Sequence, residues 1–92
     1  MHSQDSSTQV NFLFRDGHSE SFKLPLSPQE FQQKLEGLLA KPWLIFHLRD
    51  QTVVISTSQI MKVEIKPPLS ELEGEGIFPN SERVTALTRG SR

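Results

Sequence analysis

Cysteine is absent from this chain of 92 residues. A disulfide framework and a thiolate-bound zinc ion are therefore excluded as supports for a small fold, and the composition fits a reducing compartment. No stretch approaches the run of about 18 apolar residues that a membrane-spanning helix requires. Residues 1–9 are polar and lack the apolar run of a secretory signal. We therefore expect a soluble, cytoplasmic protein.

An excess of charge of one sign is also missing. The chain has 10 basic and 11 acidic residues and a formal net charge of −1. A general binder of nucleic acid or of an anionic membrane has a strongly basic surface, so this balance argues against both partners. Nucleic-acid binding is the alternative function that remains open, because small strand-rich domains bind single strands through aromatic side chains and basic grooves.

The residue patterns of catalytic and metal sites are lacking as well. The three histidines, His2, His18 and His47, are far apart in the sequence and form no HxH or HExxH motif. No serine lies in a GxSxG context, and Gly74-Glu75-Gly76 lacks the strand and helix that flank a phosphate-binding loop. We predict no enzyme activity, no cofactor and no metal ion.

What the sequence does contain is periodic apolar patterning. Apolar residues alternate along two segments separated by Asp16-Gly17, which predicts a β-hairpin; they are Val10, Phe12 and Phe14, then Phe22 and Leu24. A strict two-residue loop would place the apolar residues of the two strands on opposite faces. We therefore expect an odd-length loop or a bulge, with Phe12 opposite Phe22.

A helix follows the hairpin. Ser27-Pro28-Gln29-Glu30 matches a capping box with proline at the first helical position. Leu26 and Phe31 have the spacing of a hydrophobic staple, and Lys41-Pro42 ends the helix. The apolar stripe of this helix consists of Phe31, Leu35, Leu38 and Leu39.

Three further strands are predicted, over residues 43–48, 52–57 and 61–66. In the third, Met61, Val63 and Ile65 alternate with charged residues. The element order is β-β-α-β-β-β, which indicates an α+β fold: an antiparallel sheet, flat or curled toward a small barrel, with one helix packed on it.

The strand over 43–48 has two apolar faces. Trp43 and Ile45 point to one side, and Leu44, Phe46 and Leu48 point to the other. Burying each such side chain is worth about 1.5–3 kcal/mol, compared with about 5–15 kcal/mol for a whole domain. One helix covers only one face of a flat sheet. The other face must therefore curl on itself, accept the C-terminal tail or meet another chain.

The chain divides into three parts. We expect a disordered leader over residues 1–9, an α+β core domain over 10–66 and a polar tail over 67–92 that begins at Pro67-Pro68. Within the tail, residues 82–89 are either a short helix that orders on docking or a solvated segment. We predict a non-catalytic protein–protein interaction module, an adaptor or assembly factor that binds another protein or itself as a homodimer. Its predicted contacts are Trp43, Ile77, Phe78, Arg83 and Leu87.

One resemblance covers residues 60–90. The segments 60–68 (IMKVEIKPP), 73–80 (EGEGIFPN) and 83–90 (RVTALTRG) resemble small, uncharacterised proteins of cyanobacteria. This resemblance implies a cytosolic bacterial setting and assigns no activity, cofactor or functional residue.

Overall fold

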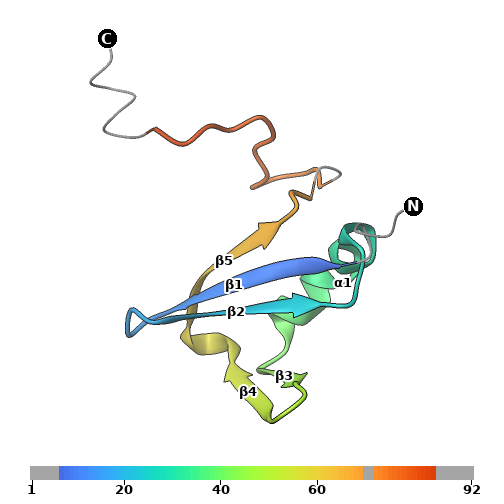
Figure 1. The fold of residues 1–92 in the computed structure, drawn as a ribbon. Helices are drawn as coiled ribbons and strands as arrows, with labels where there is room; N and C mark the ends of the chain where they lie inside the picture. The colour runs from blue at the N-terminus through green and yellow to red at the C-terminus, as the bar shows by residue number, and fades with distance from the viewer. Residues whose placement is uncertain (1–6, 70–71, 85–92) are drawn as a thin grey trace.

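A computed structural model describes residues 7–69 and 72–84 of the chain. The elements are, in chain order (Figure 1), β1 (Thr8–Phe14), β2 (Ser19–Leu24), α1 (Pro28–Ala40), β3 (Trp43–His47), β4 (Thr52–Ser56), the 3-10 helix η2 (Thr57–Gln59) and β5 (Ile60–Lys66). The predicted β-β-α-β-β-β order and the α+β class are confirmed. All strand pairs are antiparallel.

The strands form two sheets rather than one. β1 is the central strand of a three-stranded sheet with the order β2-β1-β5, and β3 and β4 form a separate two-stranded sheet. The strands do not close into a barrel, so of the two shapes left open by the sequence the curled barrel is wrong. Figure 1 shows the hairpin of β3 and β4 below the three-stranded sheet, with α1 beside it.

The loop between β1 and β2 confirms the odd-length connection. The Phe14 N–H donates to the His18 carbonyl oxygen over 3.0 Å, so the loop has three residues and ends at Gly17, whose φ is +98°. The predicted pairing was wrong by two residues, because Phe22 lies opposite Val10 and not opposite Phe12. A three-residue loop preserves the predicted faces of both strands but shifts their register.

The core begins earlier than predicted. β1 starts at Thr8, inside the segment 1–9 that was expected to be a disordered leader. Thr8 is 1 % exposed, and its hydroxyl donates to the Leu26 carbonyl oxygen over 2.8 Å. This hydrogen bond ties the start of β1 to the residue before the helix cap. Residues 1–6 of the expected leader lie outside the described residues.

A β-bulge in β5 changes which of its residues face the core. Leu13 pairs with Lys62, but the next residue, Phe14, pairs with Ile60. Met61 is therefore the extra residue of a bulge, and it is 66 % exposed although the alternation had placed it on the apolar face. Ile60 packs against the core in its place.

The helix forms as its sequence predicts. The Ser27 hydroxyl accepts a hydrogen bond from the Glu30 N–H, and the Glu30 carboxylate accepts one from the Ser27 N–H, which completes the capping box. α1 ends at Ala40, directly before Lys41-Pro42. Phe31 is buried, whereas Leu39 in the last turn is half exposed.

One hydrophobic core joins the two sheets and the helix. Its buried members come from β1, β2, α1, β3 and β4, and they are Val10, Phe12, Phe14, Phe22, Phe31, Leu44 and Ile55. The ring of Phe46 in β3 stacks on that of Phe22 with 4.3 Å between centroids and 3° between ring planes. Aromatic contacts and the buried side chains of Leu44 and Ile55 therefore hold the hairpin of β3 and β4 against the three-stranded sheet.

The other face of the three-stranded sheet is polar. The Asn11 amide donates to the Glu64 carboxylate, and the Ser21 hydroxyl donates to the Asn11 side-chain oxygen. This polar face can be exposed to solvent. The sequence had predicted a sheet with two apolar faces. Exposed apolar side chains lie on the β3-β4 hairpin, where they include Trp43, Ile45 and Val54.

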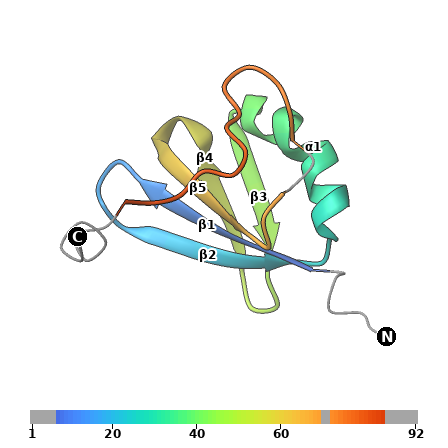
Figure 2. The same cartoon turned by 90° about the horizontal axis from the view of Figure 1, so that it is seen from above.

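The tail leaves β5 on the far side of this sheet. Leu69 packs against the core and Leu72 is half-buried, but residues 73–84 are exposed and contain neither helix nor strand. In Figures 1 and 2 this segment runs past the end of α1 and on above β5, away from β3. Of the predicted helix over 82–89, residues 82–84 are not helical, and 85–89 lie outside the described residues.

Candidate functional site

An apolar groove lies between α1 and β3, and we call it the α1–β3 groove. Its volume is about 380 Å³, within the range of cavities that hold ligands or the side chains of a partner. It is lined by Phe12, Leu24, Leu26, Phe31, Lys34, Leu35, Leu38, Leu39, Lys41, Trp43, Leu44, Ile45, Phe46 and Val63. Twelve of these residues are apolar, and the two lysines carry the only charged groups of the lining.

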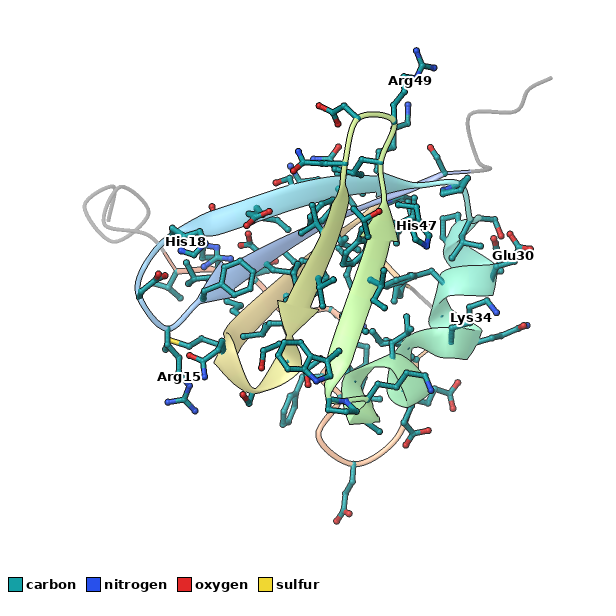
Figure 3. All side chains as sticks on the ribbon, turned by 90° about the horizontal axis from the view of Figure 1, so that it is seen from below. Arg15, His18, Glu30, Lys34, His47 and Arg49 are labelled. Carbon is teal, nitrogen blue, oxygen red and sulfur yellow. The ribbon has the colours of Figure 1, made fainter. Side chains whose placement is uncertain are left out.

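The connection between helix and strand creates the groove. Only Lys41 and Pro42 separate the end of α1 from the start of β3, so the chain turns back at once and the two elements lie side by side (Figure 3). The floor is formed by buried side chains, including Phe31 and Leu44. Lys34 projects from α1 at the side of the groove.

Two hydrogen bonds show which residues of β3 direct their backbone N–H and C=O groups toward β4. The Thr57 N–H donates to the Pro42 carbonyl oxygen over 3.0 Å, and the Leu48 N–H donates to the Gln51 carbonyl oxygen over 2.7 Å. In an antiparallel pair, residues that bond to the partner strand alternate with residues whose backbone groups face away from it. Even-numbered residues of β3 therefore bond to β4.

The odd-numbered residues of β3 form a free edge. Leu44 and Phe46 direct their N–H and C=O groups to β4, so those of Trp43, Ile45 and His47 point to the opposite side, where α1 and the groove lie. In residues 7–69 and 72–84, β3 pairs with β4 alone, and no backbone hydrogen bond joins these three residues to another element. An unpaired strand edge beside an apolar cavity is a template for another strand.

Exposed apolar side chains continue from the groove onto the outer face of the hairpin. Trp43, Ile45 and Val54 are 56 %, 58 % and 54 % exposed, and Ile45 is paired directly with Val54. Leu39 of α1 is 51 % exposed and lines the groove together with Trp43. A contiguous apolar surface of this kind marks an interaction site in soluble proteins.

The electrostatics of the groove favour an acidic or neutral partner. Lys34 and Lys41 line it, and no carboxylate or imidazole does. The groups with shifted pKa values belong to other parts of the fold. The hydrogen bond from the His18 backbone, followed by that from its side chain, lowers the pKa of Asp16 in the β1-β2 loop.

The second shifted group lies on the polar face of the three-stranded sheet. The hydrogen bond from Asn11 lowers the pKa of Glu64 most, followed by the charge of Lys62, and Arg83 of the tail contributes in the same direction. In Figures 1 and 2 the described tail runs above β5, and none of its residues lines the groove.

The structure places the predicted contact residues in two groups. Trp43 lies at the groove. Ile77, Phe78 and Arg83 belong to the tail segment 72–84, which runs away from β3 in Figures 1 and 2, and none of them lines the groove with Trp43. Leu87 lies outside the described residues. The sequence interpretation missed Leu39 and Ile45 as contact residues, although it assigned Leu39 to the apolar stripe of the helix and Ile45 to the same face of its strand as Trp43.

Comparisons with protein-family models, with curated proteins and with solved structures gave no match. They assign neither a family nor an activity, so the resemblance of residues 60–90 to cyanobacterial proteins stays a prediction. No helix in residues 7–69 and 72–84 combines the length and apolar character needed to cross a membrane. Across the same part of the chain, His, Asp and Glu side chains form no group of three suited to hold a metal ion.

Proposed function

We propose that this protein is a protein–protein interaction module that binds an extended segment of a polypeptide in the α1–β3 groove. The observation that supports this most is the unpaired edge of β3 directly beside an apolar cavity. In this role the protein is a non-catalytic adaptor or assembly factor of the cytoplasm, and it requires no cofactor.

Binding occurs by strand addition. The bound segment pairs its backbone with the free N–H and C=O groups of Trp43, Ile45 and His47, which gives affinity that depends little on sequence. Alternate side chains of the segment point into the groove and outward. Apolar residues are selected at the inward positions, because the floor of the groove offers no polar partner.

The expected affinity is moderate. Two buried apolar side chains contribute about 3–6 kcal/mol, and four backbone hydrogen bonds contribute about 1 kcal/mol each. Ordering a flexible segment on binding offsets part of this gain. We therefore expect a dissociation constant between about 1 and 100 µM, as in a reversible adaptor complex.

Selection from a phage library of random dodecapeptides tests the proposal. Selected peptides are then compared on three forms of the full chain: wild type, Ile45→Pro and Ile45→Ala. Proline removes the outward N–H of Ile45 and leaves the hydrogen bonds between β3 and β4 in place, since Ile45 does not bond to β4. Alanine shortens the same side chain and keeps that N–H.

We expect peptides with apolar residues at alternate positions. They should bind Ile45→Pro at least 10-fold more weakly than wild type, and Ile45→Ala within a few-fold of it. Circular dichroism checks that both variants keep their strands. The proposal is wrong if no peptide is selected or if Ile45→Pro binds as well as wild type.

Nucleic-acid binding is the outcome that would replace this proposal. Filter binding of a single-stranded oligonucleotide, measured at about 50 and 200 mM salt, should show no specific retention. Tight retention that weakens steeply with salt would assign the surface to nucleic acid instead.

A further inference from the structure

The tail contains an apolar pair, one member of which is largely exposed. Phe78 is 78 % exposed and Ile77 is 36 % exposed, and both precede Pro79. The pair is preceded by two carboxylates, Glu73 and Glu75, which are exposed as well. Exposed large apolar side chains in an otherwise acidic and polar segment are unfavourable in water unless they are buried elsewhere.

The α1–β3 groove matches this segment in charge and in size. Its lining is apolar apart from Lys34 and Lys41, which carry the charge opposite to that of Glu73 and Glu75. A cavity of about 150 Å³ is sufficient for one benzene ring. The groove, with about 380 Å³, therefore has room for a phenyl ring and an aliphatic side chain together.

The two features lie on opposite sides of one molecule. The tail runs along the side of the three-stranded sheet away from β3 (Figures 1 and 2). The described arrangement therefore presents Ile77 and Phe78 away from the groove of their own chain. A neighbouring molecule can reach this pair without displacement of the tail from the sheet.

We infer that the α1–β3 groove binds residues 73–79 of a second copy of this chain, with the Phe78 ring in the apolar floor and the two glutamates near the two lysines. This inference rests on the proposed function, because it names the segment that the groove binds. Because the segment and the groove lie on opposite sides of the chain, each copy can lend its segment to one neighbour while its groove accepts the segment of another, so the copies associate head to tail. Pro79 has no N–H and ends the backbone pairing after Phe78.

Sedimentation equilibrium of the full chain from about 1 µM to 1 mM tests the inference, since the moderate affinity of one groove places self-association in this range. Wild type should change from monomer to dimers and larger head-to-tail assemblies. Phe78→Ser should raise the dimer dissociation constant at least 10-fold and leave the melting temperature unchanged, because Phe78 is exposed in the monomer. Val84→Ser is the matched control: Val84 is also an exposed apolar tail residue, at 73 %, but it lies outside the segment.

A mixing experiment identifies the two surfaces as partners. Phe78→Ser retains the groove but loses the segment's ring, and Ile45→Pro retains the segment but blocks the edge of the groove. Each variant alone should be monomeric at concentrations where wild type dimerises. An equimolar mixture should form a heterodimer through the one intact pairing, at about the concentration at which wild type begins to associate.

Three results would overturn the inference. The first is a wild type that stays monomeric to about 1 mM, and the second is a Phe78→Ser variant that dimerises like wild type. The third is a monomeric wild type whose Phe78→Ser variant binds the displayed peptides more tightly, which would show that the chain's own tail occupies the groove. In each case the proposed function is tested separately, by whether the displayed peptides bind Ile45→Pro more weakly than Ile45→Ala.

Discussion

Phe46 is one of the side chains that pack the β3-β4 hairpin against the three-stranded sheet, and its truncation should weaken this contact. Its ring stacks on that of Phe22 at 4.3 Å and lies 5.8 Å from that of Phe12, centroid to centroid. Removing a fully buried phenylalanine side chain costs about 3–5 kcal/mol. Phe46 is half-buried, so we expect Phe46→Ala to lower the free energy of unfolding by about 2 kcal/mol.

Urea denaturation followed by the fluorescence of Trp43, the one tryptophan of the chain, measures this loss. Ile45→Ala is the control, because Ile45 is adjacent on β3 but is 58 % exposed, and its truncation should cost no more than about 0.5 kcal/mol. In a domain of this size, 2 kcal/mol corresponds to a fall in melting temperature of about 8–16 °C. Equal losses for the two variants would refute the assignment of Phe46 to the contact between the sheets.

Three further predictions concern local features. Ser27→Ala removes the helix cap and should destabilise the protein by about 1 kcal/mol in a thermal melt; no change would show that the cap is dispensable. Thr8→Val keeps the side-chain volume but leaves the Leu26 carbonyl without its donor, and should cost about 1–2 kcal/mol in urea denaturation; a neutral result would contradict the burial of this hydrogen bond. The pKa of Asp16 is lowered in the folded state by hydrogen bonds from His18. The stabilisation that the ionised Asp16 carboxylate contributes is therefore complete above the unfolded pKa of about 3.9 and is lost as pH falls through the lowered folded-state pKa. An NMR titration should place the Asp16 midpoint below that of an unfolded peptide, and Asp16→Asn should remove this part of the acid sensitivity, whereas a midpoint at or above the peptide value would contradict it.

The sequence predicted features that depend on neighbours along the chain. The capping box of Ser27 and Glu30 is a contact over three residues, so it can be recognised without knowledge of the tertiary structure. The alternation over 43–48 correctly separated Leu44, which is buried, from Trp43 and Ile45, which are exposed. Binary patterning is sufficient for this distinction because successive strand residues face opposite sides.

Features that depend on distant pairing could not be predicted. The bulge at Met61 exists because β5 pairs with β1, some fifty residues earlier, and nothing near Met61 in the sequence indicates it. The same pairing decides where the groove lies. Because β5 adds to β1 and not to β4, the hairpin of β3 and β4 stays a separate sheet and β3 keeps a free edge. The sequence interpretation assumed a single sheet. It therefore predicted the interaction surface on the second face of that sheet and not at the free edge of β3.

Amide hydrogen exchange along β3 tests strand addition most directly. The probe is a synthetic version of the tightest-binding displayed peptide, added in excess to the wild-type chain. We predict that exchange slows at least 10-fold at Trp43, Ile45 and His47, whose N–H groups face the groove, and changes little at Leu44 and Phe46, which already donate to β4. Slowing that is uniform along β3, or that leaves Trp43, Ile45 and His47 unchanged, would contradict binding at this strand edge.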